Sequence, residues 1–129
     1  MCTSDDTGKC LAIVGSRDYQ NYVQLSKEVD EFIKLIENKY NTKIKTIASG
    51  GAKGCDQLAE QYAKERKLEC LVFHAKWSKY GRSAGPRRNS RIVNNSDYMM
   101  AFPSSKSIGT YDSINKARKK KIEIKIIHV

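Results

Sequence analysis

The chain has 129 residues, of which 40% are hydrophobic and 29% charged, as expected for one globular domain with its own core. No apolar run approaches the roughly 20 residues that span a bilayer, and the polar start lacks the pattern of a secretory signal. Lys and Arg number 24 against 14 Asp and Glu, and the resulting net charge of +10 favours a strongly anionic ligand or a polyanionic partner. We expect residues 1–9 to form a flexible lead-in and residues 10–129 a single cytoplasmic domain without membrane contact.

Short apolar runs alternate with amphipathic segments along the chain. The apolar runs predict strands at residues 11–14, 44–48, 69–73, 98–102 and 122–127. Apolar residues at helical spacing predict helices at residues 22–38, 56–67, 86–95 and 109–120, with a long polar loop over residues 74–85. This alternation is typical of an α/β fold of Rossmann-like type, a three-layer sandwich in which helices flank a central parallel sheet of about five strands. Ligands of such folds bind in the loops that follow the strands.

The first such loop begins at Gly15, directly after the first strand. Glycine permits close approach of a ligand to the backbone, Ser16 offers a hydroxyl, and Arg17 offers a planar cation for a phosphate or a base. These three residues are candidate ligand contacts. An ordinary strand-to-helix turn is the alternative interpretation.

The second loop runs from the second strand straight into a helix and contains three glycines, Gly50, Gly51 and Gly54. Backbone N–H groups in such a loop point into a concavity, and the helix N-terminus adds partial positive charge, so the segment is typical of a phosphate site. Ser49 belongs to the same candidate site. Asp56 is either a ligand contact or the N-cap of the helix.

The third loop precedes the helix expected to start at Pro86 and carries two adjacent arginines. Neighbours on a helix point about 100° apart, so one arginine faces the cleft, and we expect Arg88 together with Asn89 rather than Arg87. Trp77, in the long polar loop, either stacks on a base or covers the core.

The fourth loop leads into the last helix through Gly109 and Thr110, a second candidate anion site. Asp112 is the carboxylate placed beside it. Its alternative role is to complement the helix dipole.

The cysteines and histidines are scattered singly, without the spacing of metal ligands, so we expect neither a metal nor a cofactor. Cys10 and Cys70 each begin an apolar run and are expected in the core. Cys55 is also expected to pack inside, although a helix N-terminus could lower its pKa. Neither His74 nor His128 is expected to bind a metal, and for His74, which ends the third strand, a structural role is expected.

With these loops in this order, the chain resembles the SLOG superfamily, and most closely its small YspA-like branch of bacterial and phage proteins. The matching segments are GSRDY, SGGAKGCDQLAEQYA, FHAKW, AGPRRN, SDYMMAF and IGTYDSINKA. The superfamily includes the cytokinin-activating LOG phosphoribohydrolases and the DNA-processing protein DprA/Smf. The resemblance implies a Rossmann-like fold, a nucleotide-derived ligand held mainly at residues 50–54 and 109–110, and a homo-oligomer.

The resemblance leaves the activity open. LOG enzymes carry a P-G-G-x-G-T-x-x-E motif with a catalytic glutamate, whereas here Ser113 stands at the glutamate position and Asp112 one position earlier. One hypothesis is hydrolysis of the N-glycosidic bond of a nucleoside 5′-monophosphate, with Asp112, or else Glu60, as the carboxylate and Arg88 assisting. A second is a non-catalytic sensor or sponge for a nucleotide or NAD-derived signal. A third is DprA-like nucleic-acid binding along a basic strip. Its candidate members are Tyr80, Arg82, Arg87, Arg88 and Arg91.

Overall fold

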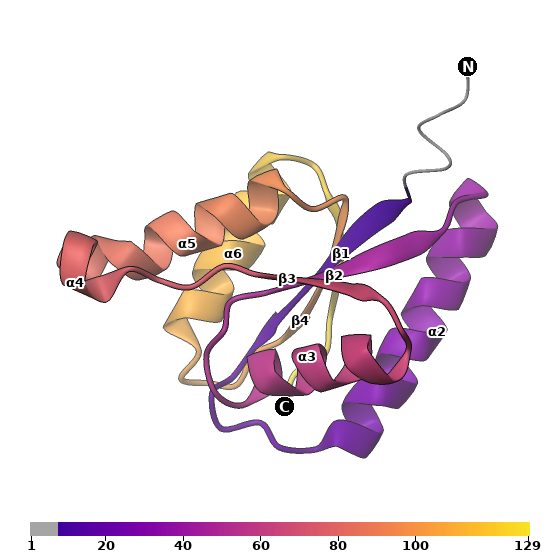
Figure 1. Ribbon diagram of the computed structural model, residues 1–129, viewed down its shortest axis with the longest axis horizontal. Helices are drawn as coiled ribbons and strands as arrows, with labels where there is room; N and C mark the ends of the chain where they lie inside the picture. Colours follow the sequence, from indigo (N-terminus) through magenta and orange to yellow (C-terminus); the bar gives the residue numbers. More distant parts are fainter. Residues whose placement is uncertain (1–7) are drawn as a thin grey trace.

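The computed structural model describes residues 8–129 and has the predicted α/β fold, a parallel sheet with helices on both faces (Figure 1). Labelled as in Figure 1, the elements are β1 (Lys9–Gly15), α2 (Tyr22–Tyr40), β2 (Ile44–Ser49), α3 (Cys55–Glu65), β3 (Glu69–Val72), α4 (Trp77–Tyr80), the 3-10 turn η1 (Gly81–Ser83), α5 (Ala84–Asn94), β4 (Tyr98–Phe102), α6 (Ile108–Lys119) and β5 (Glu123–Ile126). No helix in this part of the chain is long and apolar enough to cross a bilayer.

The strands lie in the order β3-β2-β1-β4-β5, and every neighbouring pair is parallel. The chain builds outward from β1 through β2 to β3 and then returns to the other side of β1. The order therefore reverses between β1 and β4, which is where sheets of this kind leave a crevice at the carboxyl ends of the strands. This topology confirms the Rossmann-like prediction.

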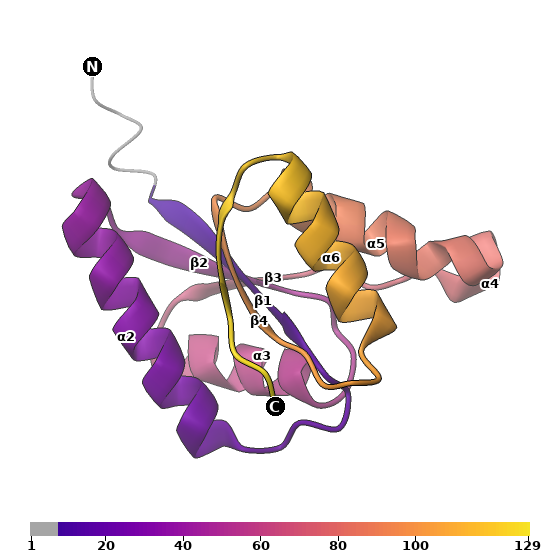
Figure 2. The same cartoon turned by 180° about the vertical axis from the view of Figure 1, so that it is seen from behind.

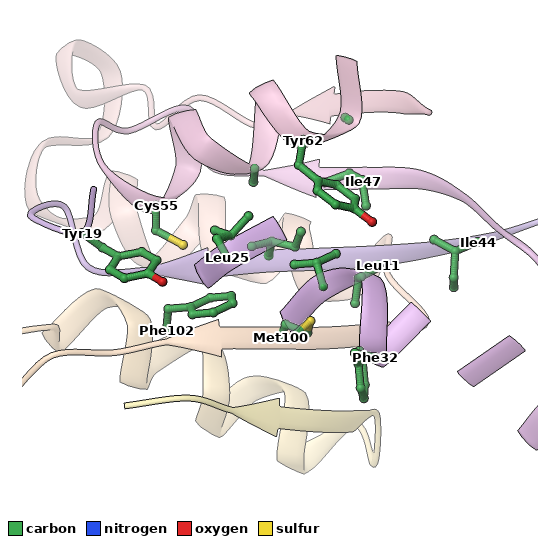
Figure 3. Packing of buried hydrophobic residues seen from close by; sticks show 14 of the residues in the cluster. Leu11, Tyr19, Leu25, Phe32, Ile44, Ile47, Cys55, Tyr62, Met100 and Phe102 are labelled. Atoms are coloured by element: carbon green, nitrogen blue, oxygen red, sulfur yellow. The ribbon is translucent and has the colours of Figure 1, made fainter. Parts of the chain in front are cut away.

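The alternation of side chains along the central strands divides the core into two layers. Leu11 and Ile13 of β1 face α2 and α3, where they pack with the aromatic residues of that layer, as Figure 3 shows for Phe32, Tyr62 and Phe102. The next residues of β1 point the opposite way, toward α5 and α6. Seen from behind in Figure 2, α6 and α5 lie together over that second face.

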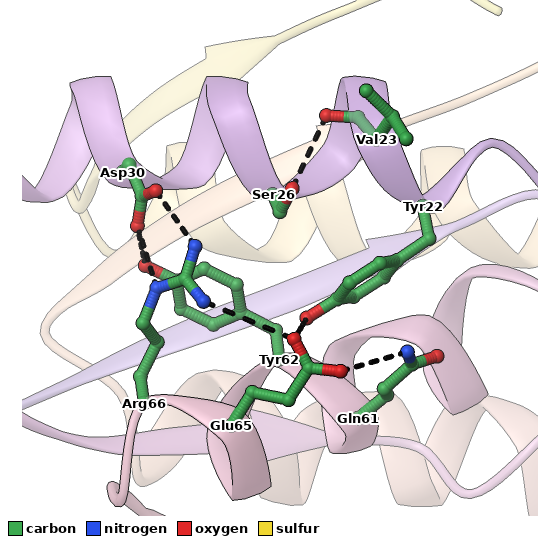
Figure 4. A network of polar contacts seen from close by, with 8 residues as sticks. All are labelled: Tyr22, Val23, Ser26, Asp30, Gln61, Tyr62, Glu65 and Arg66. Atoms are coloured by element: carbon green, nitrogen blue, oxygen red, sulfur yellow. Dashed lines mark hydrogen bonds and ion pairs between the residues drawn. The ribbon is translucent and has the colours of Figure 1, made fainter.

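A polar network at the surface joins α2 to α3 (Figure 4). Asp30 of α2 accepts two hydrogen bonds from Arg66, at 3.1 and 2.8 Å, and a third from the hydroxyl of Tyr62 at 2.5 Å. Nearby, Tyr22 donates to Glu65 at 2.8 Å. The Arg66 guanidinium keeps the pKa of Asp30 below its usual value. These contacts hold the two helices at a fixed position on their side of the sheet.

Two expectations need correction, and a third lies mostly outside the described part of the chain. The segment 74–85 is not a continuous loop, because it contains α4 and η1, and α5 starts at Ala84 rather than Pro86. Cys70 is exposed rather than in the core, because β3 is an edge strand. Of the lead-in expected over residues 1–9, residues 1–7 lie outside the described part of the chain, and Lys9 belongs to β1.

Candidate functional site

A cleft of about 470 Å³ opens at the carboxyl edge of the sheet, where the strand order reverses between β1 and β4. We call this space, bounded by the loops after β1, β2 and β4 and by the face of α5, the cleft. Its lining residues are Val14, Gly15, Ser16, Arg17, Asp18, Gly50, Ala52, Lys53, Asp56, Arg88, Asn89, Ile92, Ser104, Lys106, Ser107, Ile108, Gly109, Thr110 and Ser113. Nine of the thirteen predicted ligand contacts are among them: Gly15, Ser16, Arg17, Gly50, Asp56, Arg88, Asn89, Gly109 and Thr110.

Ser16 joins the loops that form the floor of the cleft. Its N–H donates to the carbonyl of Phe102, and its own carbonyl accepts from the N–H of Cys55, both at 3.0 Å. Its hydroxyl accepts from the hydroxyl of Ser104 at 3.3 Å. Because Ser16 is only 5% exposed, these bonds fix the spacing between the loops that follow β1, β2 and β4.

The loop after β2 approaches the loop after β1 very closely at Gly54. This residue has a φ of +78°, and a Cβ built on it would lie 2.2 Å from the carbonyl oxygen of Arg17. Only glycine fits that conformation and that gap. Gly54 is also the N-cap of α3, so the start of the helix has no side-chain cap, and the second helical residue, Asp56, lines the cleft.

Asp56 is a buried carboxylate on the cleft wall, 7% exposed and in the second position of α3 rather than at the N-cap. Its Oδ2 accepts from the N–H of Ala52 at 3.1 Å. Burial raises the pKa of this carboxyl to about 6, against the opposing effects of the Ala52 hydrogen bond and the charge of Arg88. The cleft therefore contains a carboxyl group that changes charge close to neutral pH.

Arg88 reaches the cleft from α5 and meets the loop after β2. Its Nη1 donates to the carbonyl of Gly50 at 2.6 Å, and its Nε donates to Oδ1 of Asn89 at 2.9 Å. A Cβ at Gly50 would lie 2.8 Å from both Arg88 Nη1 and Asp56 Oδ2, so the missing side chain is what lets cation and carboxylate converge. Arg87 is exposed and lies outside the cleft.

Asp112 does not line the cleft. Its Oδ2 accepts from Lys116 Nζ at 2.6 Å and from the amide of Asn89 at 3.0 Å, so the carboxylate holds α6 against α5. The helix places Thr110 and Ser113, three residues apart, on the cleft side instead.

Four of the predicted contacts also stand outside the lining. Ser49 lies behind the cleft, where its hydroxyl donates to Glu60 at 3.0 Å, and Glu60 itself does not reach the cleft. Gly51 has a φ of +72° and packs against His74. Gly54 lies beneath the loops, as described above. Trp77 is 52% exposed on α4 and packs against Gly85.

The loop after β4 contributes more than its sequence indicated. Ser104 and Ser107 line the cleft, and their hydroxyls lie 3.0 Å apart in a hydrogen bond. Ser107 is the N-cap of α6, yet its side chain makes no capping bond within the helix. Lys106, between the two serines, adds a cation to the rim. The signal for these residues was their position directly after a central strand.

The charges of the cleft favour an anion. Its described lining holds four cationic side chains, Arg17, Lys53, Arg88 and Lys106, against the carboxylates of Asp18 and Asp56. The side chain of Arg17 is exposed and makes no hydrogen bond or ion pair with any other residue in the range 8–129. Within the same range no group of His, Cys, Asp and Glu residues could hold a metal ion.

The thiol of Cys55 lies beneath the loop that follows β1 and is fully buried. Burial raises its pKa well above the usual value, opposite to the effect that a helix N-terminus exerts. The residue packs against Gly15, as expected for a core cysteine.

Comparison with known proteins gives one family and several similar folds. A family model described as the YspA, cpYpsA-related SLOG family matches residues 10–80. The Gene 61 protein of Mycobacterium phage D29 is 31% identical over 84 residues, which make up 60% of this chain and 67% of the phage protein.

Two solved structures of DNA processing protein A share the fold. The protein from Streptococcus pneumoniae has a TM-score of 0.70 and 20% identity, over 93% of this chain and 50% of that chain. The protein from Helicobacter pylori, described for its single-stranded DNA binding mode, has a TM-score of 0.65 and 18% identity, over 98% of this chain and 68% of that one. The chain thus spans about half the length of the Streptococcus protein.

Proposed function

The chain belongs to the YspA, cpYpsA-related SLOG family, and from this premise we propose that its cleft binds a phosphorylated nucleotide. The helix starts of α3 and α6 both lack a side-chain cap and border the cleft. The first N–H of each helix donates to a backbone carbonyl, Cys55 to Ser16 and Ile108 to Lys106, so an anion would be bound by the N–H groups that follow in the first turn. Family membership and the DprA-like fold support binding of a nucleotide or nucleic acid in general.

The observation that carries the proposal is the guanidinium of Arg17. It lies on the cleft rim without a hydrogen bond or ion pair to any described residue, although its charge acts on the nearby Asp56 carboxyl. The buried hydroxyl of Ser16 and the start of α6, which has no side-chain cap, lie in the same lining. A phosphate placed there would receive charge-assisted bonds from Arg17 and from backbone N–H groups. The nucleoside would then extend along the cleft toward Arg88.

Hydrolysis of the ligand is a second candidate function, favoured by the position of Asp56. An N-glycosidic bond breaks more easily when an acid protonates the departing base or a carboxylate stabilises the oxocarbenium-like sugar. A carboxyl with a pKa of about 6 suits either role, and Asp56 is the buried carboxyl that faces the cleft. Asp112 and Glu60 serve this candidate less well, because both are bonded outside the cleft.

Binding is tested by calorimetry with adenosine 5′-monophosphate (AMP) and with adenosine. We expect AMP to bind and adenosine to bind at least about tenfold more weakly, because the phosphate supplies the charge-assisted bonds. Arg17→Ala should weaken AMP binding by about tenfold or more. Arg118→Ala, which removes an equal charge from the exposed far end of α6, is the matched control and should leave it unchanged. Equal effects of the two variants would contradict the proposed site.

Turnover is tested in the same samples by chromatography for free adenine, and again with NAD and ADP-ribose. Release of a base that Asp56→Asn abolishes would support the hydrolase. Binding without release supports the sensor or sponge. No binding by any nucleotide of the panel would overturn the proposed function.

A further inference from the structure

A second hollow lies on the far side of Arg88, along α4 and α5, with a volume of about 610 Å³. We call it the α4–α5 groove. Its lining residues are His74, Lys76, Tyr80, Ala84, Arg87, Arg88, Ser90 and Arg91. In Figures 1 and 2, α4 and the start of α5 lie at the end of the molecule away from α2. The groove has four Lys and Arg side chains and no carboxylate in its described lining, whereas the cleft has two carboxylates.

Aromatic rings contact two of the four cations of the groove, Arg87 and Arg91. The guanidinium of Arg87 lies 4.3 Å from the ring centroid of Tyr80, and its Nε donates to the hydroxyl of Ser83 at 3.0 Å. The guanidinium of Arg91 lies 5.2 Å from the ring of Phe73. Planar cations that rest on aromatic faces are pre-positioned for phosphate and offer flat surfaces to a base. Interleaved cations and aromatics are typical of surfaces that bind single-stranded nucleotides.

Arg88 connects the groove to the cleft. It lines both spaces, and its bonds to Gly50 and Asn89 keep it between them. A nucleotide chain that extends from the cleft past Arg88 would have the groove as its next neighbouring hollow. A ligand with a single phosphate would leave the arginines of the groove unused.

We propose that the α4–α5 groove binds the second nucleotide of a linear nucleotide chain whose phosphorylated terminal nucleotide occupies the cleft. The inference rests on the proposed function and narrows its ligand class to chains of at least two nucleotides. Arg87 and Arg91 contact the second phosphate, and the Tyr80 side of the groove carries the second base. An acidic peptide would use the charges but not the flat aromatic and guanidinium surfaces, so the nucleotide chain fits the lining better.

The test compares AMP with the 5′-phosphorylated dinucleotide pApA by calorimetry at about 0.1 M salt. We expect pApA to bind at least about tenfold more tightly than AMP, the gain of one stacked base and one phosphate. The double variant Arg87→Ala with Arg91→Ala should remove this gain and leave AMP binding unchanged. The control removes the same charge elsewhere, through Arg118→Ala with Lys119→Ala on the exposed end of α6, and should keep the gain.

Equal affinity of the native protein for AMP and pApA would overturn the inference, and so would a gain that survives the Arg87 and Arg91 substitutions. A tetraglutamate peptide that binds as tightly as pApA and competes with it would also overturn the inference, since the groove would then bind any polyanion. Absence of AMP binding would overturn the proposed function, whereas the loss of pApA affinity in the double variant tests the groove separately. If a 5′-phosphorylated oligoadenylate of ten nucleotides binds only as tightly as pApA, the result supports a free dinucleotide as the ligand. Tighter binding of the longer chain supports the end of a single strand.

Discussion

The two faces of the sheet attach their helices by different means. Beneath α2 and α3 the core is aromatic, with Tyr19 stacked on Phe102 at 5.5 Å between ring centroids, and surface polar bonds link the two helices. Beneath α5 and α6 the buried residues are mostly aliphatic and small, and the polar groups at the helix starts face the cleft. The six buried polar residues of the described chain all gather at the cleft end of the sheet: Ser16, Ser49, Asp56, Asn89, Thr110 and Ser113. The aromatic layer therefore lies away from the binding groups, which come from the cleft end of both faces, from α3 on one side and from α5 and α6 on the other.

The largest expected effect comes from removing a buried aromatic ring from the core beneath α2 and α3. Phe32 of α2 is 3% exposed and is not part of the cleft lining, and Phe32→Ala should lower the free energy of unfolding by about 3–5 kcal/mol through lost burial and a residual cavity. Urea denaturation measures the loss, and Phe32→Leu is the matched control with a smaller loss. AMP affinity of the folded variant should stay unchanged. A parallel loss of affinity would show that the two faces are not separate.

The next effect, of opposite sign, comes from the buried carboxyl of the cleft. Burial raises the pKa of Asp56 to about 6 from its usual 3.8, so the native state holds this proton more tightly than the unfolded chain. Its contribution to stability is therefore most favourable below both pKa values and declines as the pH rises through the interval between them. Asp56→Asn should raise the free energy of unfolding at pH 7.5 by about 1–3 kcal/mol, and this gain should shrink as the pH falls toward about 4.

Urea denaturation at several pH values between about 4 and 8 checks this dependence. Asp18→Asn, at an exposed carboxylate of the same cleft, is the control and should change the stability by less than about 0.5 kcal/mol at every pH. A destabilised Asp56→Asn protein at pH 7.5 would contradict the prediction, because it would mean that the ionised carboxylate stabilises the fold.

The smallest effect is expected at the polar network between α2 and α3. Arg66 and Asp30 have side chains 37% and 48% exposed, so solvent weakens their ion pair. Arg66→Met should cost about 1 kcal/mol or less and leave AMP affinity unchanged. Thermal unfolding of the native protein and the variant, with and without about 1 M salt, measures this cost. Salt should reduce the difference in stability between the two proteins, because it screens exposed charges. Lys64→Met, at an exposed position in the last turn of α3, two residues before Arg66, is the control. A cost above about 2 kcal/mol would contradict this prediction, because exposed ion pairs contribute less than that.

The elements could be predicted wherever an apolar pattern marks them. The run ending at Gly15 and the run from Tyr98 to Phe102 both form central strands, because both of their faces are covered. The helix α4 was missed because none of its residues is buried, so it has no apolar period to read. The exposure of Cys70 was missed for a related reason: an apolar strand at the edge of a sheet looks like a central one in sequence.

The loops of the cleft could be predicted as well, but the direction of individual side chains could not. Asp112 and Ser113 are neighbours, and the phase of α6, which starts one residue earlier than expected, decides which of them meets the cleft. Asp56 was ambiguous for the same reason, since its role depends on Gly54 being the N-cap. These choices depend on contacts between loops that are distant in the sequence.

Arg88, which borders both the cleft and the α4–α5 groove, has a thermodynamic consequence. An anion bound on either side draws on the same positive charge and acts on the same bonds to Gly50 and Asn89. If both spaces bind anions as proposed, occupancy of one space alters affinity in the other, and the factor is the same in both directions because binding free energies are reciprocal. For two separate anions that share one guanidinium the factor is antagonistic. When the two phosphates belong to one nucleotide chain, binding of the first phosphate holds the second beside its site at high effective concentration, which favours binding at both sites.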